Sequence, residues 1–125
     1  MQNQNAKPQT ELKYRAYQYS IDMIKFIDSL SKDVSTDTIS RQLLRSSTSI
    51  GANIVEAKGA NSKKDFANFF GYSLKSANES LYWLGLLRDA KGIKKQQLDY
   101  LLKETKELAN ILGASMLTIK GKNKF

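Results

Sequence analysis

The stretch "QLLRSSTSIGANIVEA", residues 42–57, decides the fold because it can be read in two ways. Its serines, glycine and asparagine are typical of a loop, since these residues have low helix propensity. The apolar residues nevertheless keep a helical spacing across the polar ones, so that one face carries Ile39, Leu43, Ser47, Ile50, Ile54 and Ala57. Because the spacing is unbroken, we predict a helix from about residue 37 to 58, capped by Ser35 or Thr36 and ended by Gly59.

Three further segments show the same periodicity. The first, residues 10–32, starts at Thr10 and has its apolar face at Leu12, Ala16, Tyr19, Met23, Ile27 and Leu30. Another, residues 62–92, runs from the cap Ser62 to the stop signal Gly92, with Phe66, Phe70, Ser73, Ala77, Leu81 and Leu84 on one face. The last, residues 94–119, has its apolar face at Leu98, Leu101, Leu102, Thr105, Leu108, Ala109, Leu112, Met116 and Ile119.

These four segments predict the fold class and the domain organisation. No strand pattern competes with them, and short loops favour antiparallel neighbours, so we predict an all-α, antiparallel up-down-up-down four-helix bundle. The bundle is expected to form a single domain over residues 10–120. Residues 1–9 are predicted to be a flexible polar tail, and residues 121–125 a basic tail.

The composition excludes several classes of chemistry. The 125 residues include no cysteine and no histidine, so zinc sites of the usual kind and histidine-dependent nucleophilic catalysis are impossible. We therefore predict a protein that is not an enzyme, with no cofactor, no metal and no small-molecule substrate. The N-terminal residues resemble no signal peptide, and no apolar run is long enough to span a membrane. A cytoplasmic protein without a membrane partner is expected.

Two helices carry a second apolar stripe that a monomeric bundle does not need. These stripes predict a homo-oligomer interface, because large apolar patches seldom stay exposed on monomers. Its residues are Tyr14, Tyr17, Ile21, Ile24, Tyr72, Trp83 and Leu86. The alternative is that these aromatic side chains lie partly exposed with their polar ends in water.

A polar line runs beside the isoleucine face of the second helix. It consists of Gln42, Arg45, Ser49, Asn53 and Glu56. Arg45 and Glu56 lie roughly 16 Å apart along a helix axis and cannot pair within it. We interpret the line as a hydrogen-bonded packing seam between helices. A ligand-binding line is the alternative, with Glu56 as the best general base and no nucleophile beside it.

The formal net charge of +8 is consistent with an acidic partner. An up-down-up-down topology collects the chain start, the second loop and the chain end at one end of the bundle. We predict that this end binds RNA or DNA non-specifically through Lys58, Lys63, Lys64, Lys120, Lys122 and Lys124. One alternative is that these lysines only aid solubility. Another is a protein-interaction scaffold or accessory subunit that docks another polypeptide around Tyr72 and Trp83.

The stretch "RQLLRSSTSIGANIVEAKG" resembles the signature of the 23S rRNA intervening-sequence family of small bacterial four-helix-bundle proteins. The matching residues are Gln42, Leu43, Arg45, Ser49, Ile50, Asn53, Ile54 and Glu56. A second match lies in "DFANFFGYSLKSANESLYWLGLLRD", at Asp65, Phe66, Phe69, Ser76, Glu79 and Leu87. Ser46 and Ala57 depart from the pattern, where the family usually has alanine and glycine.

This resemblance covers residues ~10 to ~120 and carries its own implications. It implies a four-helix bundle that assembles into a ring-like homopentamer, as the related accessory proteins of diversity-generating retroelements do. It also implies a connection with RNA or DNA. It brings no enzymatic activity.

Overall fold

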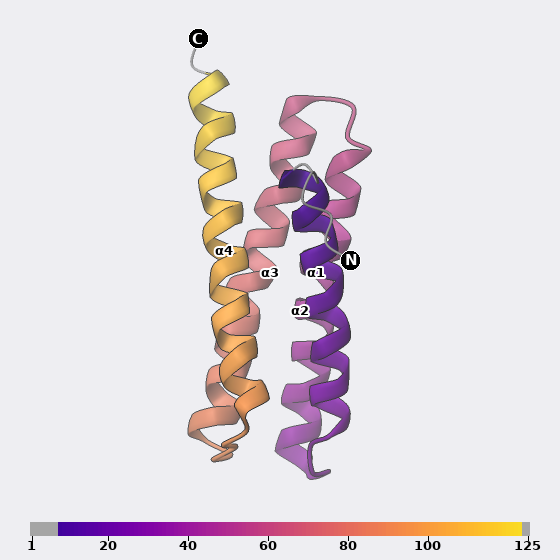
Figure 1. The fold of residues 1–125 in the computed structure, drawn as a ribbon. Helices are drawn as coiled ribbons and strands as arrows, with labels where there is room; N and C mark the ends of the chain where they lie inside the picture. The colour runs from indigo at the N-terminus through magenta and orange to yellow at the C-terminus, as the bar shows by residue number, and fades with distance from the viewer. Residues whose placement is uncertain (1–7, 124–125) are drawn as a thin grey trace, which may run out of the picture.

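The structure, a computed structural model, describes the backbone of residues 8–123 and the side chains of residues 12–121. It contains four helices in chain order: α1 (Pro8–Asp28), α2 (Val34–Lys58), α3 (Lys63–Asp89) and α4 (Gln96–Asn123). The helices run alternately down and up (Figure 1). The predicted all-α, up-down-up-down four-helix bundle is confirmed. Residues 42–57 lie entirely within α2, so the stretch that could have been a loop is helical.

Two helix starts differ from the prediction. α1 begins at Pro8, within the predicted tail and two residues before Thr10. The cap of α2 is Asp33, not Ser35 or Thr36: its carboxylate accepts a hydrogen bond from the Thr36 backbone N–H at 2.9 Å. A carboxylate also suits the positive end of the helix dipole better than a hydroxyl. The predicted cap of α3 is correct, because the Ser62 hydroxyl accepts from the Asp65 backbone N–H at 3.1 Å.

Helix ends follow the glycine signals. Gly59 caps α2, and its N–H donates to the Glu56 carbonyl at 3.1 Å. Gly92, at φ +66°, turns the chain after α3 and lets the Ile93 N–H reach the Leu87 carbonyl at 3.3 Å. α1 ends at Asp28, four residues earlier than predicted, whereas α4 continues to Asn123, into the predicted basic tail. Lys124 and Phe125, the rest of that tail, lie outside the described residues.

The core is a set of apolar side chains from all four helices, and most of the predicted faces are buried. On α1, Phe26 is fully buried while the predicted Ile27 is partly exposed, because Phe26 lies within the same face as Met23 and Leu30. On α3, Phe66 and Leu81 are only partly buried, and Ser80 and Leu87 are buried instead. The face of α3 is therefore turned further toward α2 than its apolar residues alone suggest.

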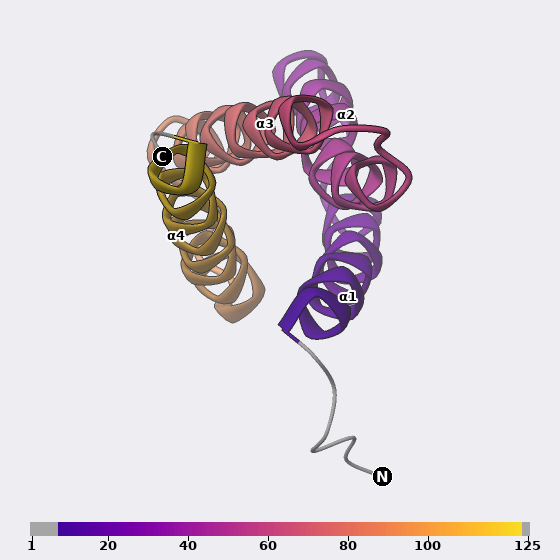
Figure 2. The ribbon, with the colours of Figure 1, turned by 90° about the horizontal axis from the view of Figure 1, so that it is seen from above.

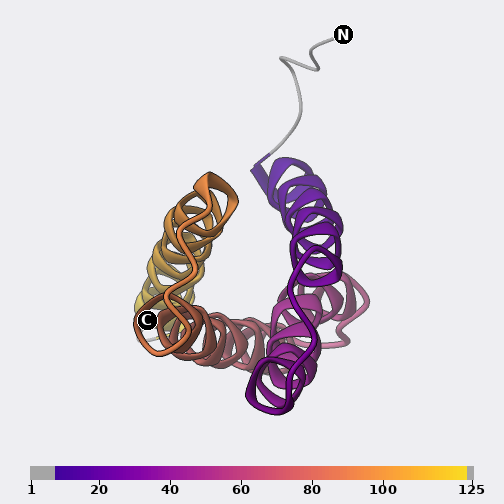
Figure 3. The same cartoon turned by 90° about the horizontal axis from the view of Figure 1, so that it is seen from below.

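The four helices follow an arc when the bundle is viewed along its axis (Figures 2 and 3). α2 and α3 pack most extensively, α3 and α4 next, and α1 and α4 least. α1 and α2 come close at Gly51, where a Cβ would lie 3.4 Å from the Ala16 Cβ, about a van der Waals distance. Within residues 8–123, no helix combines the length and the apolar character that a membrane crossing requires.

Polar contacts hold the open side of the arc, between α1 and α4. Arg15 pairs with Glu104 at 2.6 Å and with Glu107 at 2.6 Å. The hydroxyl of Tyr19 shares a buried hydrogen bond with that of Thr105 at 2.5 Å. α1 is therefore attached to α4 by a few specific contacts, whereas a broad packed face joins α2 and α3.

Candidate nucleic-acid interface

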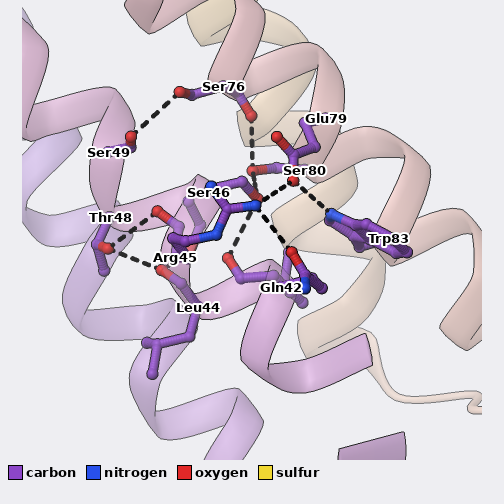
Figure 4. Close-up of polar contacts among 12 residues, drawn as sticks. Gln42, Leu44, Arg45, Ser46, Thr48, Ser49, Ser76, Glu79, Ser80 and Trp83 are labelled. Carbon is purple, nitrogen blue, oxygen red and sulfur yellow. Dashed lines mark hydrogen bonds and ion pairs between the residues drawn. The ribbon is translucent and has the colours of Figure 1, made fainter. Parts of the chain in front are cut away.

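Serines line the seam between α2 and α3. The hydroxyls of Ser46 and Ser80 are 2.8 Å apart, and those of Ser49 and Ser76 are 3.2 Å apart (Figure 4). Ser73 donates to the Ile50 carbonyl at 2.8 Å. Small side chains let the two helices approach closely, and each hydroxyl has a partner across the seam. This arrangement accounts for Ser46 and Ser49, whereas Ser47, Thr48 and Asn53 bond to carbonyls of their own helix.

Arg45 of the predicted polar line has its partner within the chain. Its guanidinium donates to a Glu79 carboxylate oxygen at 3.2 Å and to the Gln42 side-chain oxygen at 2.8 Å (Figure 4). The same oxygen of Glu79 accepts from the Trp83 indole N–H at 2.9 Å. Arg45 therefore joins α2 to α3 on the outer edge of the serine seam.

The other two members of the polar line have different surroundings. Asn53 donates to the Ser49 carbonyl at 2.8 Å, one turn earlier in the same helix. Glu56 is exposed and forms no ion pair with another described residue. The structure thus brings Gln42, Arg45 and Ser49 to the α2–α3 seam, and leaves Glu56 at the surface near the end of α2.

Sequence reasoning missed the partners of this line on α3. Ser76 and Ser80 face the serines of α2, and Glu79 meets Arg45. A signal was present in the sequence, because Ser73, Ser76 and Ser80 are spaced by three and four residues, as Ser46 and Ser49 are by three. Two helices with small residues at such intervals can pack closely, but the sequence does not specify which pairs meet.

The lysines of the predicted interface gather at one end of the bundle, the upper end in Figure 1. Lys58 lies in the last turn of α2, Lys63 and Lys64 open α3, and Lys120 lies near the end of α4. All four are exposed, and none forms an ion pair with another described residue. The side chain of Lys122 and all of Lys124 lie outside the described residues. We call the four described lysines the basic end.

Cations elsewhere are more often neutralised by carboxylates. At the opposite end, Arg88 pairs with Asp89 at 2.7 Å and Lys91 with Asp33 at 3.2 Å. The Thr36 backbone N–H, with help from Lys91, lowers the pKa of Asp33 to about 2. Arg15 of α1 is matched by Glu104 and Glu107 of α4. The four lysines of the basic end have no such partner among the described residues, although exposed lysines elsewhere, such as Lys32 and Lys94, are also unpaired.

The residues of the predicted oligomer interface differ in exposure. Tyr14 and Tyr17 are 64% and 68% exposed, and Tyr72 is 52% exposed. Ile24 is also exposed, whereas Ile21, Trp83 and Leu86 are partly buried. Tyr82, which was not predicted, is exposed next to Trp83 and contacts its ring edge to face. Whether these residues meet another subunit stays a prediction.

The α1 members of that set border a groove between α1 and α2, which we call the tyrosine groove. Its lining residues are Lys13, Tyr14, Tyr17, Ser20, Thr48, Gly51, Ala52 and Val55. The groove has a volume of about 450 Å³. No acidic side chain lines it, and Lys13 is its one charged residue. Elsewhere in the described part of the chain, no three carboxylates gather as potential metal ligands.

Comparisons with known proteins agree with this architecture. The family model described as 23S rRNA-intervening sequence protein matches residues 9–114. A crystal structure from Bacteroides thetaiotaomicron VPI-5482, of a protein with unknown function from the S23 ribosomal protein family, is 32% identical with a TM-score of 0.75. The similarity covers 84% of this chain and 97% of that one. None of the curated proteins compared matches the sequence. The resemblance inferred from residues 42–57 is confirmed.

Proposed function

Because the chain belongs to the 23S rRNA-intervening sequence protein family, and because four exposed, unpaired lysines from three helices lie at one end of the bundle, we propose that it is a nucleic-acid-binding protein. In this proposal it is a non-enzymatic, homo-oligomeric four-helix bundle. It binds RNA or DNA in the cytoplasm through the basic end, without reading sequence.

The observation that carries the proposal is that four unpaired lysines lie at the same end of the bundle. Lys58, Lys63, Lys64 and Lys120 come from three helices, and the topology brings them to one end (Figure 1). Unpaired surface lysines exchange condensed counterions for phosphate contacts, which favours binding to any nucleic acid strand. The described part of the chain offers no established base-reading motif, so non-specific binding follows.

Self-association would multiply this effect. The exposed aromatic face of α3, with Tyr72, Tyr82 and the partly buried Trp83, supports a contact between copies, because aromatic residues are enriched at such contacts. A head-to-tail contact whose rotation closes forms a ring, and every copy in a ring presents its basic end on the same rim. The homopentamer implied by the family resemblance is the assembly that we propose.

The direct test is a charge-reversal variant in which Lys58, Lys63 and Lys64 are changed to glutamate. Binding of a fluorescently labelled RNA or DNA strand is measured by anisotropy at low salt. We expect binding to be lost, because each change removes one phosphate contact and adds a repulsive charge.

The matched control changes Lys25, Lys32 and Lys94 to glutamate, near the opposite end of the bundle. These lysines are also exposed, and the net charge changes by the same amount. The control should retain most of the affinity, since only the general field changes. An equal loss in both variants would show that net charge, and not the basic end, determines binding.

A protein-interaction scaffold is the competing function, and the same α3 face would carry it. Capture of partners from a lysate, with and without nuclease, separates the two functions. A partner that is retained after nuclease treatment and lost on changing Tyr72 to glutamate would favour the scaffold over nucleic-acid binding.

A further inference from the structure

The tyrosine groove begins just below the basic end on the α1–α2 side of the bundle. Lys58 follows Val55, a lining residue, by one helical turn. From this continuity we propose that the groove binds the bases of a single-stranded nucleic acid whose phosphates contact the lysines. The inference rests on the proposed function and names the class of ligand.

Two tyrosine rings form the platform for such a strand. Tyr14 and Tyr17 are 64% and 68% exposed, the highest exposures among the aromatic residues of the described helices. Residues three apart on a helix have Cβ atoms about 5–6 Å apart, so the two rings are neighbours on one side of the groove. Stacking on aromatic side chains is the common means of holding unpaired bases, and it tolerates any sequence because every base has a π face.

The charge of the groove suits a polyanion. Lys13 lies beside the two tyrosines at the edge of the groove, and Lys58 lies above it. Ser20 and Thr48 are the other polar lining residues, and no carboxylate is among them. A lysine adjacent to aromatic rings places a cation near the backbone of a strand whose bases lie on the rings, and so combines a phosphate contact with stacking.

The apolar character of the groove favours a single strand over a duplex. Its lining is mainly apolar and includes Gly51, Ala52 and Val55. Its volume of about 450 Å³ lies within the usual range for sites that hold small planar ligands. Bases in a duplex are stacked on one another and paired, so they offer no free face to a tyrosine without being unstacked at a cost in free energy.

The test compares five proteins on matched probes, using the full chain. The probes are a labelled 12-nucleotide RNA strand, the same strand in a duplex, and the DNA versions of both. Changing Tyr14 and Tyr17 together to alanine should weaken single-strand binding by roughly tenfold or more. Affinity for the duplex should change little. RNA and DNA strands should behave alike, since the shared π face is what the rings recognise.

Three controls identify the contribution of the rings. Phenylalanine at both positions should restore single-strand affinity, because stacking needs the ring and not the hydroxyl. Changing Tyr100 to alanine should have no effect on strand affinity, since it is 45% exposed on α4, outside the groove. Changing Lys13 to glutamine should instead lower the slope of the salt dependence of binding by the equivalent of about one phosphate contact. The tyrosine changes should leave this slope unchanged.

Two results would overturn the inference while leaving the proposed function intact. One is equal affinity for strand and duplex in both the natural protein and the alanine variant. The other is a fall in solution mass for the alanine variant with no change in strand affinity, which would make the groove a contact between copies. Failure of the unchanged protein to bind any probe would overturn the proposed function and the inference together.

Discussion

Among single residues, Tyr19 shows how this core accommodates a polar group. Its ring is fully buried, and burial raises the pKa of its hydroxyl far above the usual value, so the group stays neutral. Thr105 donates to the Leu101 carbonyl at 2.5 Å, so Tyr19 must donate to Thr105. Within the described side chains, no buried polar atom lacks a partner. The Tyr19–Thr105 hydrogen bond therefore links α1 to α4 without leaving a polar group unsatisfied.

Changing Tyr19 to phenylalanine should lower the free energy of unfolding by about 1 kcal/mol. The loss is modest because Thr105 keeps its hydrogen bond to the Leu101 carbonyl and the change leaves no charged group without a partner. Urea denaturation followed by circular dichroism measures it. The control changes Tyr17 to phenylalanine, since Tyr17 is 68% exposed. Equal stability of the two variants would contradict a role for the buried bond.

Asp33 makes stability depend on pH in a defined window. Its pKa is about 2 in the folded chain, against a usual value of about 3.9. A lowered pKa means that the charged carboxylate stabilises the fold above about pH 4, and that this contribution is lost as the pH falls toward 2. Changing Asp33 to asparagine keeps a good cap but removes the charge. The variant should melt at a lower temperature at pH 7, and the difference should shrink between pH 4 and pH 2.

A second variant separates the two causes of the lowered pKa of Asp33. The backbone N–H of Thr36 is the largest contributor to the lowered pKa, ahead of Lys91. Changing Lys91 to methionine should therefore preserve most of the pH dependence. If the dependence vanished with Lys91, the ion pair and not the cap would be its source.

At the scale of helices, α1 is the least firmly attached element on its α4 side. The outer helices have fewer packed neighbours than the α2–α3 pair, and Arg15 bridges the gap to two glutamates. Glu104 is only 12% exposed, so this pair is better shielded from solvent than an ordinary surface pair. The stability of α1 should therefore depend on a few polar contacts more than that of any other described helix.

Changing Arg15 to leucine should destabilise α1 more than the rest of the bundle. We expect a loss of about 1 kcal/mol in the free energy of unfolding, at the upper end for partly exposed ion pairs. Amide hydrogen exchange should accelerate in α1 before it does in α3. The control changes Arg88 to leucine, because its partner Asp89 is the next residue in the chain. Uniform acceleration across all four helices would argue against a locally attached α1.

The helices could be predicted from the sequence because their signals are local. The period of Leu43, Ile50 and Ile54 survives the serines between them, and Ser62 and Gly59 mark boundaries by side-chain chemistry that needs no distant partner. The α2 cap was harder to predict, because Asp33, Ser35 and Thr36 are all good capping residues and the differences in their capping preference are small. The candidate site was harder to predict than the helices. The Arg45–Glu79 ion pair and the tyrosine groove both depend on how each helix is rotated about its own axis against its neighbour, which local sequence signals do not specify.

For the whole molecule, the distribution of charge follows from topology. An even number of antiparallel helices brings the α2–α3 loop and the end of α4 together, and with them the basic end (Figure 1). Ion pairs with Asp33 and Asp89 reduce the charge of the opposite end. The bundle, with a formal charge of +8, therefore presents four unpaired lysines together at one end and paired and unpaired cations at the other.

Self-association predicts a solution mass that is a multiple of 14.1 kDa at micromolar concentration. Light scattering coupled to size exclusion measures it directly. Changing Tyr72 to glutamate should lower the mass, because a charge at a desolvated contact is costly. The control changes Val34 to glutamate, an 86% exposed position at the start of α2. A monomer in the unchanged protein would contradict the assembly.

The central claim is that the basic end binds phosphates, and the salt dependence of strand binding tests it most directly. If the four described lysines of one copy each release a counterion, the logarithm of the binding constant should fall with the logarithm of salt concentration at a slope of about −3. A ring that engages several copies would give a steeper slope. An affinity for single-stranded RNA that stayed constant between low and physiological salt would contradict the account.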